Sequence, residues 1–349
     1  YRVDGVILPA VEADGTRTTS CKLCGLCGYA HFGPHINDEQ CRGCGELMEG
    51  ASNLFTQLLR LTGVKTRRTA RITSDEEERL RLGYDVRTAF AFAAGTDGDR
   101  RTQVSFVSAG GEANAAGELA LTATLWRFNL GWVRRKNKEV HGFDLNTSTG
   151  AWARSDQEPA DDGSDEPDDV AGVMQRVVPF VEDRRNAFTL RSTEKLTPEQ
   201  LISLQYAIKR GIETVYQVEP SELAAEPLPS PEDPRQILFY ESAEGGAGVL
   251  ERVALDREGL SRVCRAALEV CHFDPDTGDD LRRAPDARED CEAACYDCLL
   301  SYSNTRYHLI LDRAGVRDVL LKLAASVAEV GSGSRSRAEQ LARLRRTAD

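Results

Sequence analysis

Residues 237–248 read Ile-Leu-Phe-Tyr-Glu-Ser-Ala-Glu-Gly-Gly-Ala-Gly, and an apolar run from Val249 to Leu255 follows them. The apolar residues before an acid predict a buried strand, and the glycine-rich turn predicts a tight connection into a helix. A second helix is expected to end near Cys271 and His272. The strand, turn and helices favour an α+β fold organised around residues 237–313.

Four cysteines of this region are spaced like the ligands of a metal site. Cys271, Cys291, Cys295 and Cys298 form the pattern C-x19-C-x3-C-x2-C. Thiolates at such spacing can close a tetrahedral zinc site and fix a loop onto helix ends. We therefore expect a four-cysteine zinc site that closes a C-terminal strand–helix unit. Cys264, in the middle of a predicted helix, is interpreted as a small core residue.

A second group of cysteines predicts an N-terminal zinc ribbon. The pattern C-x2-C-x13-C-x2-C, with a glycine after each pair, is formed by Cys24, Cys27, Cys41 and Cys44. Glycine there lets the backbone turn tightly, so that its N–H groups approach the sulfurs. Cys21 remains an alternative ligand in place of Cys24 or Cys27. His31 and His35 are interpreted as loop residues.

The totals favour a globular, intracellular protein. A chain of 349 residues with 41% hydrophobic residues has room for two or three packed units. No apolar run approaches the roughly 20 residues of a membrane span, and no signal peptide is visible. CxxC pairs without a secretory signal favour metal ligands in a reducing cytoplasm over disulfides. The start at Tyr1 and the Gly-Ser run from Gly331 lead us to expect a piece of a longer chain.

Charge is distributed unevenly along the chain, whose net charge is −12. Residues 156–169 contain eight acids and no base, so the rest of the chain carries −4. Residues 60–138 contain fifteen Lys and Arg against nine Asp and Glu. We interpret 155–170 as a disordered acidic linker. The basic sector is a candidate for contact with nucleic acid.

Two groups of residues in the basic sector are candidate nucleic-acid ligands. The first is the basic run that follows an aromatic residue in a β-rich stretch: Trp132, Arg134, Arg135, Lys136 and Lys138. Cations track phosphates and a ring can stack on a base, although a solvated hairpin tip would have the same composition. The second group is Arg67, Arg68 and Arg71.

Several motifs resemble the C-terminal zinc-binding domain family of MrfA-type superfamily-two helicases, whose relatives occur in DISARM and Druantia anti-phage systems. They are the turn from Glu241 to Gly248, Cys295-Tyr-Asp-Cys298-Leu, Asn304 and Leu311-Asp-Arg313. The resemblance implies the accessory C-terminal part of an ATP-dependent DNA helicase in defence or repair. Its ATP-binding motor would lie upstream, because this chain has no P-loop motif.

Two other readings remain open. A zinc-stabilised scaffold could bind other proteins of a defence complex without touching DNA. A cryptic nuclease centre could combine Glu241, Asn304, Asp312 and Arg313, with the turn at Gly245–Gly248 as a backbone nest for phosphate.

The expected organisation has five segments. They are a zinc ribbon with flanking strands (1–60), a β-rich basic domain (61–154), the acidic linker (155–170), a strand–helix domain with the second zinc site (171–330), and a linker with a basic tail (331–349).

Overall fold

The computed structural model describes residues 2–11, 16–48, 52–67, 83–95, 98–153, 173–242 and 246–331, and the chain divides into two compact units. Unit 1 comprises Tyr1–Phe90 and Leu125–Asp183, and unit 2 comprises Ala91–Thr124 and Arg184–Asp349. The fold is α+β, as predicted. The units divide the chain differently from the expected segments, because three long strands have residues in both: β6 (Tyr84–Phe92), β10 (Ala113–Trp132) and β12 (Met174–Ser192).

Unit 1 is built mainly from strands. Besides its parts of the three long strands, its elements are β1 (Arg2–Val6), β2 (Thr19–Cys24), β3 (Ala30–Phe32), the 3-10 helix η1 (Gly33–Asn37), β4 (Ser52–Arg60), β5 (Val64–Arg67) and β11 (Phe143–Asn146). Strand β2 pairs antiparallel with β3 and β4, and β4 pairs in parallel with β12. Strand β1 pairs with β5 rather than with a neighbouring strand of residues 1–20.

Aromatic rings fill the centre of unit 1. Phe128 lies 6.1 Å from Phe55 and 5.8 Å from Phe180, measured between ring centroids. Phe32 joins them from β3, with its ring 4.7 Å from that of Trp126. Burial of such rings is a large apolar contribution to stability, and it holds the β2–β3 hairpin that carries the first cysteines.

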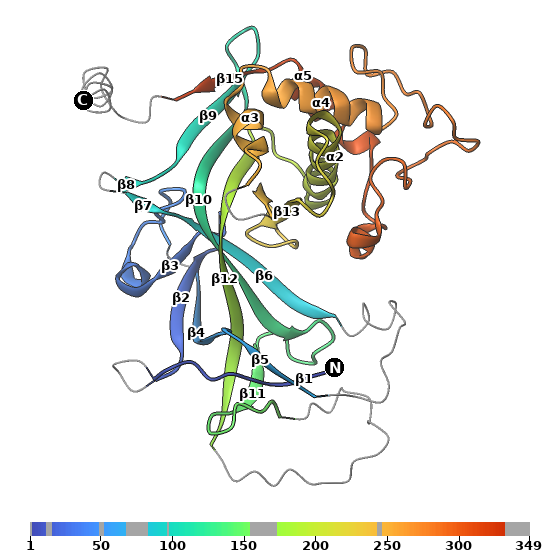
Figure 1. Ribbon diagram of the computed structural model, residues 1–349. Helices are drawn as coiled ribbons and strands as arrows, with labels where there is room; N and C mark the ends of the chain where they lie inside the picture. Colours follow the sequence, from blue (N-terminus) through green and yellow to red (C-terminus); the bar gives the residue numbers. More distant parts are fainter. Residues whose placement is uncertain are drawn as a thin grey trace. The chain divides into compact units, whose positions relative to one another are not determined.

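Unit 2 combines strands with helices. Its further elements are β7 (Ala94–Gly95), β8 (Gly98–Asp99), β9 (Thr102–Val107), α2 (Pro198–Tyr216), β13 (Leu223–Leu228), β14 (Gln236–Glu241), α3 (Val249–Leu255), α4 (Gly259–Val270), η2 (Tyr302–Tyr307), η3 (Ala314–Val316), α5 (Arg317–Ala324) and β15 (Val327–Val330). Within this unit, helices α2 to α5 gather on one side of the strands (Figure 1).

One hydrophobic core joins the strands and helices of unit 2. It includes Phe239 of the predicted buried strand, Ile208 of α2 and Val263 of α4. Helices α2 and α4 meet closely at Gly211, where an added Cβ would lie 2.3 Å from the carbonyl oxygen of Val263. The packing places the C-terminal end of α4, and therefore the residues that follow it, against the core.

The sequence Thr197-Pro198-Glu199-Gln200 predicts the start of a helix, and α2 begins there. The Thr197 hydroxyl accepts a hydrogen bond from the Gln200 backbone N–H, and the Gln200 side chain accepts one from the Thr197 N–H. This reciprocal pair is the capping box expected from Thr-Pro-Glu-Gln, and it satisfies two backbone donors that the helix itself leaves unpaired.

One strand was misread from the sequence. The polar residues within 177–188 predict a turn between two strands, whereas β12 runs without interruption from Met174 to Ser192. The polar residues at its middle, such as Asp183 and Arg184, are exposed on the strand instead of forming a turn. A polar run on a solvent-facing stretch therefore imitates a turn signal.

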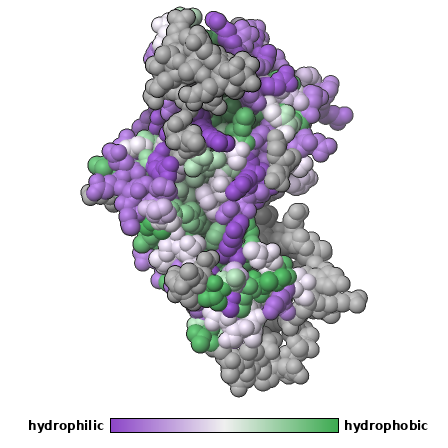
Figure 2. Space-filling model, turned by 60° about the vertical axis from the view of Figure 1, so that its left-hand side comes forward, coloured by the Kyte–Doolittle hydropathy of each residue, from purple (hydrophilic) through white to green (hydrophobic). Residues whose placement is uncertain are grey.

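The capping-box pattern of Ser74 and Glu77 predicts a short helix that ends at Gly83. Most of that segment, and the whole acidic linker at 155–170, lie outside the described residues. Among the described helices, none has the length and apolar character to cross a membrane. Figure 2 shows hydrophobic patches interrupted by hydrophilic residues on the face that it presents.

Candidate metal centres and nucleic-acid surface

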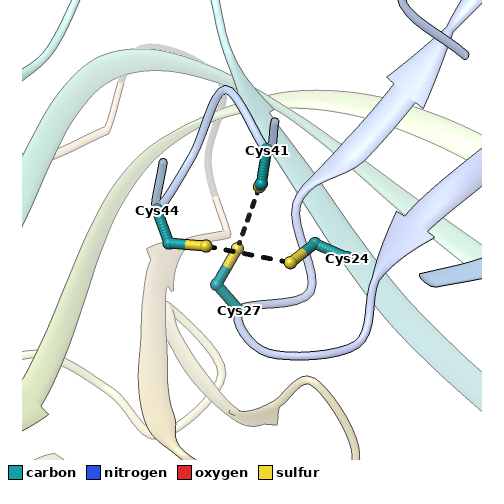
Figure 3. Close-up of side chains that lie close together, drawn as sticks. All are labelled: Cys24, Cys27, Cys41 and Cys44. Atoms are coloured by element: carbon teal, nitrogen blue, oxygen red, sulfur yellow. Dashed lines mark hydrogen bonds between the residues drawn. The ribbon is translucent and has the colours of Figure 1, made fainter. Parts of the chain in front are cut away.

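The N-terminal cysteines converge as predicted. The Sγ atoms of Cys24 and Cys44 lie 3.8 Å apart and those of Cys27 and Cys41 lie 3.5 Å apart, with all four within 4.8 Å of one another. Figure 3 shows the four side chains pointing toward a common centre. A tetrahedral zinc ion with Zn–S bonds of about 2.3 Å places its sulfurs about 3.8 Å apart. The four thiols are free rather than joined in disulfides, so their arrangement fits a zinc ion.

Two glycine turns produce this geometry. Gly28 and Gly45 have φ values of 76° and 78°, and their N–H groups donate to the carbonyl oxygens of Cys24 and Cys41. Left-handed backbone is readily adopted by glycine, so a glycine after each CxxC pair lets the chain turn back under the sulfurs. The glycine after each CxxC pair therefore makes the tight turn that the sequence predicts.

The alternative ligands lie outside this group. Cys21 is fully buried on β2, and burial raises the pKa of its thiol to about 12. His35 pairs with Asp38 and Arg42. His31 is 1% exposed, and neither of its ring nitrogens has a hydrogen-bond partner among the residues that the structure describes. We retain Cys24, Cys27, Cys41 and Cys44 as the ligand set.

The C-terminal group differs from the prediction at one position. Its members are His272, Cys291, Cys295 and Cys298, and their ligand atoms lie within 4.8 Å of one another. The His272 Nε2 lies 3.2 Å from the Cys295 Sγ, and the Cys298 Sγ lies 3.8 Å from that of Cys291 and 3.6 Å from that of Cys295. The predicted ligand Cys271 is not in the group, although its buried side chain lies in the same hydrophobic core of unit 2 as those of Cys291 and Cys298. The set is therefore three cysteines and a histidine.

The end of α4 explains why His272, and not Cys271, lies in the C-terminal group. Cys271 caps the helix, and the N–H groups of His272 and Phe273 donate to the carbonyl oxygens of Glu269 and Leu268, both at 2.9 Å. This is the Schellman pattern, in which the residue after the cap adopts a left-handed conformation. His272 has φ of 62°, a position usually taken by glycine. The turn separates the directions of the two side chains and places the imidazole near Cys295.

Burial influences the protonation of these ligands. It lowers the pKa of His272, which favours the neutral imidazole that can bind a metal. It raises the pKa values of the Cys291 and Cys298 thiols, so their thiolate forms need a nearby cation. Zinc in either centre would cross-link segments, since four protein ligands leave no open position for a substrate.

The glycine turn beside Glu241 is occupied by the chain itself. The Glu241 carboxylate is 4% exposed and accepts hydrogen bonds from the N–H groups of Val249 at 2.6 Å and Leu250 at 3.1 Å. It also accepts from the Asn186 amide at 3.0 Å. An internal carboxylate thus occupies the anion-binding position at the start of α3, where the nest for phosphate was considered.

The nuclease reading finds no geometric support among the described residues. Asn304 bonds to the carbonyl oxygen of Leu299, and Arg313 bonds to Asp280. None of the hydrogen bonds in the structure joins two members of the set Glu241, Asn304, Asp312 and Arg313.

Some side chains of the basic run are exposed, and others already form hydrogen bonds or ion pairs within the chain. Arg135 is 11% exposed and pairs with Asp85 at 2.8 Å, and Lys138 donates to the carbonyl oxygen of Val133. Arg134 and Lys136 are exposed. The exposed cations of the predicted set are therefore Arg134, Lys136 and Lys138, and of these Lys138 is hydrogen-bonded to Val133. Of the second group, Arg67 ends β5 without a described side chain, and Arg68 and Arg71 lie outside the described residues.

Trp132 belongs to an aromatic stack in unit 1. Its ring lies 4.4 Å from that of Tyr84 at an angle of 27°, and Phe143 meets its edge from 6.3 Å. Tyr84 is 47% exposed. One face of Trp132 is thus covered, and Tyr84 presents the more accessible ring beside the basic run.

The ligand exchange can be tested with three variants of the 349-residue chain. We expect His272→Ala to lower the zinc content from two ions to one, because it removes a ligand that no other side chain replaces. Cys271→Ser should keep both ions, and His272→Cys should restore a four-ligand set. Elemental analysis measures the content, and cobalt absorption spectra report the number of thiolates. Loss of zinc in Cys271→Ser with retention in His272→Ala would instead establish the four-cysteine set.

Comparisons with known proteins give a family for part of the chain. The MrfA Zn-binding domain family matches residues 204–299. No curated protein sequence matches the chain. Among solved structures, the chain is similar to a crystal structure of the DUF1998 helicase MrfA bound to DNA, with 10% sequence identity and a TM-score of 0.35. That alignment covers 66% of this chain and 25% of the helicase chain, so this chain spans about a quarter of the helicase's length. The segment that matches the MrfA Zn-binding domain family, residues 204–299, includes every residue of the C-terminal group His272, Cys291, Cys295 and Cys298.

Proposed function

We propose that the chain is an accessory module of an ATP-dependent DNA helicase or translocase that acts in anti-phage defence or DNA repair. It binds DNA and braces a motor that lies upstream in the complete protein. The observation that carries the proposal is the match to the MrfA Zn-binding domain family at residues 204–299, a segment that contains the whole His272, Cys291, Cys295 and Cys298 centre.

The chemistry of the metal centres supports a bracing role. Both centres offer four protein ligands, so a zinc ion in either has no position left for water or substrate. Such sites stabilise a local structure rather than carry out a reaction. A rigid accessory module can support a motor domain while binding the DNA along which the motor moves.

The exposed part of the basic run supports DNA contact. Arg134 and Lys136 are exposed and lie close in sequence to the Tyr84–Trp132 stack. Cations can neutralise phosphates, and an exposed aromatic ring can stack on an unpaired base. Single-stranded DNA, which offers both groups, is therefore the proposed ligand of this surface.

The salt dependence of DNA binding tests this surface. Replacing Arg134 and Lys136 by Ala should weaken binding to a single-stranded oligonucleotide and reduce the slope of log K against log salt by about 1.4, since each phosphate contact contributes about 0.7. Fluorescence anisotropy over a salt series measures the slope. A matched control replaces Lys195 and Arg257, two exposed cations of unit 2, and should leave the slope unchanged. Equal slopes for all three proteins would remove this surface from the proposal.

The aromatic stack makes a separate prediction. Tyr84→Ala should weaken binding to single strands by about 1–3 kcal/mol, the range for loss of one base stack, and should affect duplex DNA much less. Thermal unfolding of the same variant measures any loss of packing on Trp132. A fall in melting temperature with unchanged affinity for single strands would show that Tyr84 acts only in the fold.

The scaffold reading rests on a different surface. Tyr302 is 83% exposed and Leu309 is 100% exposed, both in the segment after the C-terminal centre. Single exposed apolar residues are common on protein surfaces, and only a contiguous apolar patch is typical of a contact with another protein. Absence of any salt-dependent DNA binding by the chain would favour this reading over the DNA-binding module.

A further inference from the structure

Arg313 is a buried cation, and every N–H group of its guanidinium donates a hydrogen bond. Its side chain is 3% exposed, and Nη1 and Nη2 form a bidentate pair with the two carboxylate oxygens of Asp280 at 2.8 and 3.0 Å. Nε and Nη2 donate to the carbonyl oxygen of Cys291 at 3.0 and 2.7 Å, and Nη1 donates to that of Cys271 at 3.2 Å. A guanidinium has five N–H donors, and here all five have acceptors.

These acceptors belong to the segments that carry the metal ligands. Cys271 directly precedes the ligand His272, and Cys291 is itself a ligand. Asp280 lies in the connection between them, and the guanidinium carbon lies 4.8 Å from the ring centre of Phe273. One side chain therefore fixes both ends and the middle of the stretch from 271 to 291.

Besides Arg313, this stretch is held by local backbone hydrogen bonds, by an isolated bridge between Phe273 and Asp280, and by the pair Arg265–Asp276. Residues 274–290 contain no helix or strand of the structure, and most of them are partly or fully exposed. A segment that buries little apolar surface does not fix its own position. The hydrogen bonds from Arg313 hold the two ends of this stretch where its metal ligands must lie.

Charge provides a second reason. Three thiolates and a neutral imidazole around a divalent zinc ion leave a formal charge of minus one, in a site where three of the four ligands are buried. An uncompensated charge in a low-dielectric surrounding is costly, and a nearby cation reduces that cost. Arg313 is the buried cation bonded to the backbone of the ligand residue Cys291.

We propose that Arg313 is the positioning residue of the C-terminal metal centre. It holds His272 and Cys291 in binding geometry before the metal arrives, and it offsets the charge of the thiolates afterwards. The proposal rests on metal binding at this centre. It assigns to the Arg of the Leu311-Asp-Arg313 motif a role in metal retention rather than in catalysis.

The test is the rate of zinc release to a chromogenic chelator from Arg313→Ala, Arg313→Lys and Asp280→Asn. We expect the C-terminal zinc to leave about 10- to 100-fold faster from both Arg313 variants, the usual effect of losing a residue that orients ligands. The lysine variant should not retain zinc better than the alanine variant, because a single ammonium group cannot reproduce the planar arrangement of N–H donors in a guanidinium. Asp280→Asn keeps the carbonyl contacts and should have an intermediate effect, and guanidinium ion should slow release from Arg313→Ala.

Two controls come from the same molecule. The N-terminal zinc serves as an internal reference, because its release should be unchanged in every variant. Arg265→Ala removes an exposed pair to Asp276 in the same loop, at 2.7 Å, and should leave both rates unchanged. Cobalt spectra of Asp280→Asn should still show three thiolates, which separates altered retention from a lost ligand.

Release from the Arg313 variants within twofold of the unaltered chain would overturn the role of Arg313. If Arg313→Ala does not fold, Asp280→Asn decides alone, and an unchanged rate in that variant also overturns it. An unaltered chain that binds only the N-terminal zinc would contradict metal binding at the C-terminal centre itself, which is a different failure.

Discussion

Both metal centres depend on one electrostatic constraint: their ligand atoms lie within 4.8 Å of one another, and most of them are sulfurs that bind metal only as thiolates. Two unit negative charges 4 Å apart repel by about 4 kcal/mol at an effective dielectric constant of 20. A cation at the centre reverses this repulsion. Without one, burial favours the protonated thiols, as the raised pKa of Cys298 indicates. The folded arrangement of the two loops and the binding of a cation are therefore linked.

This link explains how irregular segments are held in place. The first centre joins the β2–β3 turn to the loop at Cys41 and Cys44, and the second joins the end of α4 to residues 291–298. Neither loop has long stretches of paired backbone in the part of the chain that the structure describes, so a bound metal would replace secondary structure as the source of order. Glu241 follows a related logic, because its buried carboxylate satisfies the N–H groups at the start of α3. The Arg313 guanidinium then holds the backbone that ligation alone would leave unsupported.

Local spacing made parts of the structure predictable from the sequence. The grouping of Cys24, Cys27, Cys41 and Cys44 could be predicted because short CxxC pairs with following glycines specify their own turns. The capping box at Thr197 was equally local. The choice between Cys271 and His272 was not predictable in this way. It depends on where α4 ends and on a left-handed residue after the cap, and glycine, the usual signal for that conformation, is absent.

The contacts of other residues were not predictable because their partners are distant in the chain. Arg135 looked like an exposed cation within a basic run, whereas it pairs with Asp85, fifty residues earlier. Trp132 looked like a free ring, whereas Tyr84 covers one of its faces. Arg313 was considered for a nuclease centre, and its actual partners at Cys271, Asp280 and Cys291 are defined only by the folded loop. Composition indicates which residue types are present, but not which of them are already engaged.

X-ray absorption at the zinc edge of the purified chain tests the central claim most directly. One centre with four sulfurs and one with three sulfurs and a nitrogen predict an average of about 3.5 sulfur and 0.5 nitrogen ligands per zinc, at two zinc ions per chain. An average of four sulfurs would contradict the assignment of His272. A single zinc ion per chain would contradict the two-centre account.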